Sequence, residues 1–171
     1  IRAMTTQRAE RFQGPLHDRL AESGVALVLC PHLPGTYANG ATFWLGKYKA
    51  VVMMTLRYRW ADVFWFSLFH ELGHILLHNR QAVILEGDGA NAAQEELEVE
   101  ADRFAADTLI PPRAYKAFLE TGRFFAEDIE RFSRQVGISP GIVVGRLQKE
   151  GRVKASWHNG LRVRFAWEKD K

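Results

Sequence analysis

The chain has 171 residues, 47% of them hydrophobic and 25% charged, which is ordinary for a globular protein and enough to bury a real core. Its formal net charge of +3 is too small to indicate nucleic-acid binding by itself. The single cysteine, Cys30, rules out an intramolecular disulfide and a thiolate metal cluster, and it favours a reducing cytoplasm. The sequence has no run of about 18 apolar residues, so we expect no membrane segment.

The first third of the chain predicts one helix and a small sheet. Residues 5–22 have helical periodicity, which Gly14 and Pro15 are expected to break. Residues 31–35 are typical of a turn, and 46–49 suit the connection of a hairpin. Three short apolar runs predict the strands, at 25–30, 41–45 and 50–56.

The rest of the chain predicts mainly helices. Asp62 can cap a helix that runs to about His78, and residues 79–91 carry a loop signature. A second long helix is expected at about 92–109, where two prolines stop it. Three shorter helices and a terminal strand follow, near 112–121, 125–136, 139–149 and 161–167. Because no repeat or linker divides the chain, we expect one α+β domain over residues 1–171.

Ionisable side chains interrupt the apolar segment WFSLFHELGHILLH at 65–78. His70 and His74 belong to an H-E-x-x-H motif, and residues four apart on a helix share a face, so both imidazoles can bind one metal ion. Glu71 is then placed beside the metal, where it can take a proton from a metal-bound water. Zinc suits this set of ligands best. The alternative, two core histidines with a stray glutamate, is disfavoured because chance would not also place the motif on an apolar helix.

A third ligand is expected from the helix at 92–109. Glu98 shares a face with Ala101 and other small residues that can pack against the motif helix, so we expect Glu98 to bind the metal and Asp102 to orient a ligating imidazole. His78 lies too far along its helix to be a ligand, and it is interpreted either as a residue that contacts a metal ligand or as a surface residue. The remaining acidic residues are expected to face solvent, with the first of them the closest competitor of Glu98: Glu95, Glu96, Glu100 and Asp107.

The segments HELGHILLH (70–78) and ELEVEADRFAADTLIPP (96–112) resemble the ImmA/IrrE-type zinc metallopeptidases. Together with GATFWL (40–45) and ISPGIVVGRLQ (138–148), they are similar to the branch fused to helix-turn-helix regulators and HigA-like antitoxins. The resemblance covers roughly residues 20–167. It implies a zincin-like α+β fold, with a small antiparallel or mixed sheet packed on the motif helix and a helical C-terminal part.

The resemblance also implies functional roles. Zinc would be held by His70, His74 and Glu98, with Glu71 as the general base, and at Asp102 asparagine is also common. The implied function is that of a zinc-dependent endopeptidase domain that cleaves or regulates a protein partner, such as a transcriptional repressor or an antitoxin-system component. The alternative is a catalytically silent, metal-binding regulatory or sensor domain of a transcriptional regulator.

The first residue of the chain is Ile1, so we expect a piece of a longer protein whose helix-turn-helix domain would make any contact with DNA. Residues 132–147 themselves have the spacing of a helix-turn-helix around Gly137, with basic residues nearby at Arg131, Arg134, Arg146 and Lys149. The apolar residues of this segment are equally those of a packed helical hairpin, which we favour.

The sequence suggests a candidate edge for peptide binding and a set of side chains that could stabilise an oxyanion. The hairpin at 41–56 could offer an exposed edge to an extended peptide by strand addition. Four side chains are candidates for stabilising an oxyanion, and the sequence does not rank them: Tyr48, Tyr58, Tyr115 and His158.

Overall fold

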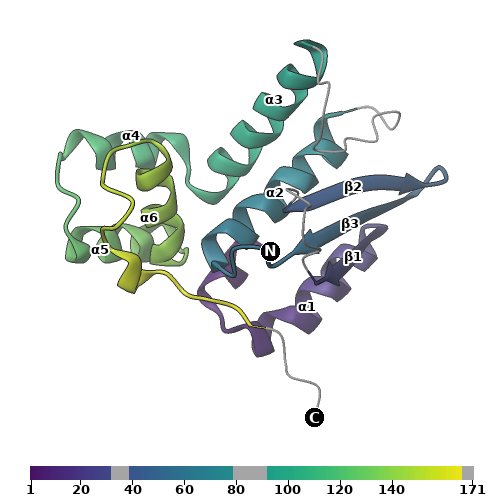
Figure 1. Ribbon diagram of the computed structural model, residues 1–171, viewed down its shortest axis with the longest axis horizontal. Helices are drawn as coiled ribbons and strands as arrows, with labels where there is room; N and C mark the ends of the chain where they lie inside the picture. The colour runs from purple at the N-terminus through teal and green to yellow at the C-terminus, as the bar shows by residue number, and fades with distance from the viewer. Residues whose placement is uncertain (32–38, 79–91, 167–171) are drawn as a thin grey trace.

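The computed structural model describes residues 1–31, 39–78 and 92–166, which form an α+β fold (Figure 1). In chain order the elements are η1 (Arg2–Thr6), α1 (Ala9–Glu22), β1 (Val25–Cys30), β2 (Gly40–Leu45), β3 (Lys49–Thr55), α2 (Ala61–Leu77), α3 (Ala92–Leu109), α4 (Pro112–Glu120), α5 (Ala126–Val136), α6 (Pro140–Lys149) and η2 (Asn159–Leu161). The expected α+β class is therefore confirmed. The loop expected at 79–91, and all but the first residue of the turn expected at 31–35, lie outside the described residues.

The sheet is mixed, with the strand order β1-β3-β2. β1 runs parallel to β3, whereas β2 and β3 form the antiparallel hairpin that the sequence predicts. The register sets Leu27, Val52 and Thr42 side by side across the three strands, and all three are buried. Since side chains alternate along a strand, Gly40 faces the same way as Thr42. This face of β2 meets α2.

Helix α1 is continuous, so the predicted break at Gly14 and Pro15 is wrong. Both of these residues are exposed, while a buried stripe on the opposite side of the helix anchors it. Phe12, in this stripe, packs its ring against Trp65 of α2, with the ring centroids 4.7 Å apart. Tertiary packing of an amphipathic helix thus outweighs the cost of an exposed proline in its interior.

Helix α3 packs along α2, as Figure 1 shows. The two helices are in close contact at Gly73, where a Cβ atom would lie 3.2 Å from the Cα atom of Ala101. Ala101, Ala105 and Leu109 are fully buried, which confirms the predicted inward face of this helix. Small residues on both helices let the two backbones come close, and this brings the polar residues of α3 within reach of those of α2.

Helices α4, α5 and α6 gather on the side of α2 away from the sheet (Figure 1). α5 and α6 form a hairpin around Gly137, which ends α5 in the left-handed region at φ 72°. The apolar residues of this segment are buried in the core: Ile138, Ile142, Val143 and Leu147. Ion pairs hold the arginines, Arg131 with Asp128, Arg134 with Glu130 and Arg146 with Glu150. Packing, as favoured from the sequence, accounts for this hairpin.

The C-terminal segment differs from its prediction. In the described part of residues 161–167, strand pairing is limited to one bridge between Trp60 and Arg164. Asp62 also differs, because Trp60 occupies the N-cap position of α2 and Asp62 instead forms a two-pronged ion pair with Arg162, at 3.0 and 2.8 Å. Both differences reflect a contact between residues about 100 positions apart. None of the described helices is both long and apolar enough to cross a membrane.

Candidate metal centre

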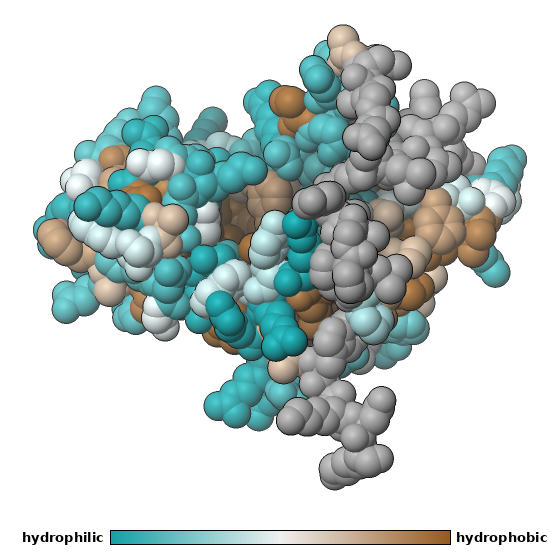
Figure 2. Space-filling model, in the orientation of Figure 1, coloured by the Kyte–Doolittle hydropathy of each residue, from teal (hydrophilic) through white to brown (hydrophobic). Residues whose placement is uncertain are grey.

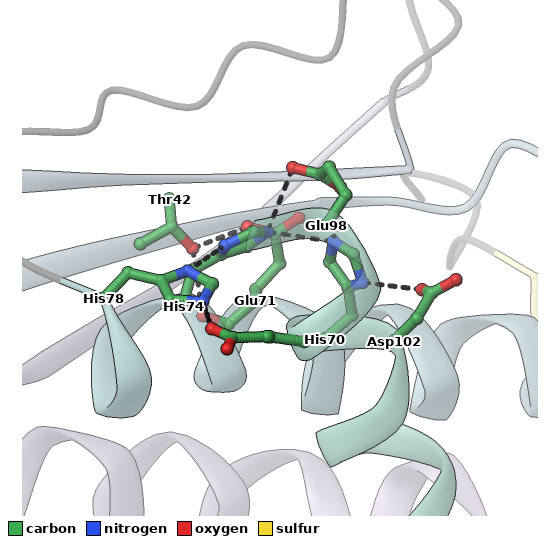
Figure 3. Close-up of polar contacts among 8 residues, drawn as sticks. Thr42, His70, Glu71, His74, His78, Glu98 and Asp102 are labelled. Atoms are coloured by element: carbon green, nitrogen blue, oxygen red, sulfur yellow. Dashed lines mark hydrogen bonds and ion pairs between the residues drawn. The ribbon is translucent and has the colours of Figure 1, made fainter. Parts of the chain in front are cut away.

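Two imidazoles and a carboxylate converge between α2 and α3 (Figure 3). The Nε2 atom of His70 lies 2.9 Å from Nε2 of His74 and 3.2 Å from Oε2 of Glu98. His74 Nε2 lies 3.4 Å from Glu98 Oε1. One ligand atom from each residue lies within 4.8 Å of the other two, so the three side chains could hold one metal ion. We call them the ligand cluster.

The contacts among the three side chains of the ligand cluster leave polar atoms without partners, and a metal ion would satisfy them. Glu98 Oε1 is buried and accepts no hydrogen bond from the described residues. The two facing Nε2 atoms are both buried, and neutral imidazoles in this arrangement can share only one proton between them. Buried polar atoms normally find partners, and a cation between two nitrogens and a carboxylate would supply one. Two nitrogens and one oxygen are a common set for zinc.

Asp102 contacts the ring nitrogen of His70 that faces away from the ligand cluster. Its Oδ1 atom lies 2.9 Å from His70 Nδ1, so the imidazole donates from Nδ1 and keeps its Nε2 atom toward the ligand cluster. This hydrogen bond lowers the pKa of Asp102. Burial opposes the charging of His70, but the bond to Asp102 and the carboxylates of Glu71 and Glu98 outweigh it and raise the pKa of His70.

His74 is held in a different electrostatic environment. Burial, followed by repulsion from the imidazoles of His70 and His78, lowers the pKa of His74 to about 4. His74 is therefore neutral near pH 7, as an imidazole must be to bind a metal. On its outer edge, His74 Nδ1 lies 2.9 Å from His78 Nδ1. Of the two sequence interpretations of His78, contact with a motif histidine is the one that the structure supports.

Glu71 is buried, with 4% of its surface exposed, beside the ligand cluster. The hydroxyl of Thr42 donates a hydrogen bond of 2.6 Å to its Oε2 atom. Two positions before Thr42, Gly40 leaves the space that this carboxylate needs, since a Cβ atom there would lie 2.6 Å from Glu71 Oε1. Strand β2 therefore positions Glu71, a contribution that the sequence did not reveal because Thr42 lies 29 residues away.

The geometry agrees with a comparison with known families. The model of the IrrE N-terminal-like domain, peptidase family M78, matches residues 62–148, just over half of the chain. The chain belongs to this family. No curated protein matches the chain significantly. The matched residues include the ligand cluster and Glu71, and membership indicates a zinc metallopeptidase-type domain.

In this M78 domain a cleft of about 870 Å³ adjoins the ligand cluster. It lies among α2, α3 and α6, and Figure 2 shows the hollow between the α4–α6 side of the molecule and α3, with apolar residues on its floor. Both Glu71 and Glu98 line it. The described lining contains none of the four side chains considered for stabilising an oxyanion: Tyr48, Tyr58, Tyr115 and His158. Tyr115 donates a hydrogen bond of 2.8 Å to Glu150, which itself lines the cleft.

Proposed function

We propose that this domain is a zinc-dependent endopeptidase that acts on a protein partner, such as a transcriptional repressor or a component of an antitoxin system. One observation carries the proposal. The buried carboxylate of Glu71 lies beside the ligand cluster and in the lining of the cleft, and yet it is outside the set of three ligands. A carboxylate in this place suits proton transfer, whereas a purely structural metal site has no need of it.

His70, His74 and Glu98 would hold the ion. Zinc bound there would polarise the scissile carbonyl and bring the pKa of a water close to about 7. Glu71 takes a proton from the attacking water and then delivers it to the leaving amine nitrogen. Thr42 orients the Glu71 carboxylate before it takes the proton, because its hydrogen bond to the ionised Oε2 is short and charge-assisted.

The position of β2 supports a peptide as the substrate. This strand pairs with β3 along one edge, and no described strand pairs with its other edge. The same strand contacts Glu71 through Thr42. An extended peptide added to the outer edge of β2 would therefore be close to the general base, and its backbone would be held by hydrogen bonds that are independent of sequence.

Any DNA binding would belong, in this proposal, to a separate helix-turn-helix domain of a longer chain. Within this domain, the arginines of the α5–α6 hairpin are already paired with carboxylates three or four positions away in the sequence. An ion pair must be broken before such an arginine can bind a phosphate, which weakens the electrostatic basis of binding.

The test compares the wild type with Glu71→Gln in cells of the organism that encodes the chain. Elemental analysis of both purified proteins is expected to give about one zinc per chain. New protein N-termini are then compared by mass spectrometry, and cuts in a regulatory protein are expected only with the wild type. Zinc-loaded proteins that give the same N-termini would refute the endopeptidase and favour the catalytically silent regulatory domain. Absence of zinc from both would refute the metal site itself.

A further inference from the structure

The two motif histidines are held in different ways on the side away from the ligand cluster. His70 Nδ1 meets a carboxylate directly, that of Asp102. His74 Nδ1 meets another imidazole, that of His78, at 2.9 Å (Figure 3). His78 Nε2 in turn lies 3.2 Å from Glu100 Oε2. The orientation of His74 thus depends on a chain of two residues, where that of His70 depends on one.

The proposed zinc site fixes the direction of each hydrogen bond in this chain. If Nε2 of His74 gives its lone pair to a metal, the proton of the neutral ring must be on Nδ1. His74 Nδ1 then donates to His78 Nδ1, which must be the acceptor. The proton of His78 is consequently on Nε2, which donates a hydrogen bond to the carboxylate of Glu100. One tautomer of each ring satisfies every contact.

Burial supports a positioning role for His78. Its side chain is 3% exposed, while that of Glu100 is 54% exposed, so the chain leads from the ligand cluster toward solvent. His78 is the C-cap residue that directly follows α2, four positions after His74, and Glu100 comes from α3. Both ring nitrogens of His78 form hydrogen bonds, Nδ1 with His74 and Nε2 with Glu100. His78 is therefore not available as a fourth ligand in this arrangement.

We infer that His78 and Glu100 are positioning residues for His74, and that they hold its imidazole with Nε2 directed at the metal. This inference rests on the zinc site of the proposed function. It extends the role of Glu100, which the sequence grouped with the solvent-facing residues. Loss of such a partner of a ligand typically weakens metal affinity by about 10–100-fold.

The test measures zinc affinity by competition with a chromophoric chelator. His78→Phe removes both hydrogen bonds and is expected to weaken zinc binding about 10–100-fold. His78→Asn keeps an acceptor where Nδ1 was and is expected to restore most of the affinity. Glu100→Gln is expected to weaken binding several-fold, to a smaller extent than His78→Phe, while the matched control Glu96→Gln keeps wild-type affinity.

A spectroscopic measurement separates positioning from a general loss of structure. In the zinc-loaded protein, the Nδ1 proton of His74 is expected to give a downfield NMR resonance that persists in His78→Asn and is lost in His78→Phe. Unchanged zinc affinity and an unchanged resonance in His78→Phe would overturn this inference and leave the proposed function standing. A Glu100→Gln protein with the same zinc affinity as Glu96→Gln would do the same. Failure of the wild type to bind zinc would overturn the proposed function as well.

Discussion

The two ends of helix α2 both bury ionisable side chains, but they satisfy them differently. Near its N-terminus, Asp62 receives two hydrogen bonds from Arg162, one on each carboxylate oxygen. Toward its C-terminus, His70 and His74 converge with Glu98 of α3. Although His74 Nε2 lies 3.4 Å from Glu98 Oε1, this oxygen accepts no hydrogen bond from the described residues. The first end is complete within the chain, whereas the second retains capacity for a ligand.

Glycine enables the close approach at both ends. A Cβ atom on Gly145 of α6 would lie 2.5 Å from Asp62 Oδ2, and one on Gly73 would lie 3.2 Å from the backbone of Ala101. The packing device is therefore the same, and the difference lies in the chemistry that it brings together. A buried charge that the chain satisfies by itself indicates structure, while a converging set of donors with an unsatisfied atom indicates a binding site.

The largest effect, on zinc affinity, is expected at the ligand cluster near the C-terminal end of α2. Glu98→Gln removes the anionic ligand, so zinc affinity should fall by more than the roughly 100-fold that marks the loss of an outer partner. Chelator competition measures this, and Glu96→Gln on the same helix is the control. Equal affinities of the two variants would show that α3 supplies a different ligand, with Glu95 the first to examine.

At the N-terminal end of α2, where Asp62 pairs with Arg162, the expected effect is on stability. Arg162→Met leaves the carboxylate of Asp62 buried without its partner, and breaking such a pair costs about 3–5 kcal/mol of unfolding free energy. Burial raises the pKa of Asp62, against the influence of Arg162, so this carboxyl is already costly to ionise. Urea unfolding measures the loss, and zinc content should not change.

Arg164→Met is the control for this variant. The guanidinium of Arg164 lies over the same Trp60 ring as that of Arg162, with Cζ 4.2 Å from the ring centroid. It forms no ion pair within the part of the chain that the structure describes, so its loss should cost less than about 1 kcal/mol. Similar losses in both variants would show that stacking on Trp60, rather than the pair with Asp62, stabilises this end.

A smaller effect on metal binding is expected from Asp102, which touches His70 but not the ligand position. Asp102→Ala should weaken zinc binding about 10–100-fold, while Asp102→Asn, which can still accept the hydrogen bond from Nδ1, should retain most of the affinity. Chelator competition distinguishes the two variants. An equal loss in both would mean that the charge of Asp102 matters more than its hydrogen bond.

The smallest effect is expected in the α5–α6 hairpin. Arg131→Ala and Arg134→Ala should not change the affinity of this domain for DNA, because both arginines are paired within α5 and the hairpin is used for packing. Gel shifts at two salt concentrations measure this. Tight, salt-dependent binding that either substitution abolishes would restore the helix-turn-helix interpretation of residues 132–147.

Sequence patterns predicted the elements whose burial repeats with a regular period. The hairpin of β2 and β3 and helices α2 and α3 formed where expected, since alternating or helical apolar periods are local properties. Local sequence signals gave wrong predictions where contacts between residues far apart in the sequence determined the structure. Pro15 does not break α1, because the buried side of the helix is anchored by α2. In the described part of the alternating tail, strand pairing is limited to one bridge, and Arg162 there pairs with Asp62.

By itself the sequence determined that His70 and His74 share a helix face with Glu71 beside them, because a spacing of four residues fixes this in any helix. It also narrowed the third ligand to one face of α3. Only the tertiary structure decided that Glu98 reaches both imidazoles, that Thr42 holds Glu71, and that Glu100 reaches His78. These contacts join residues 22 to 29 positions apart in the sequence. Those between α2 and α3 also depend on the close approach of the two helices at Gly73.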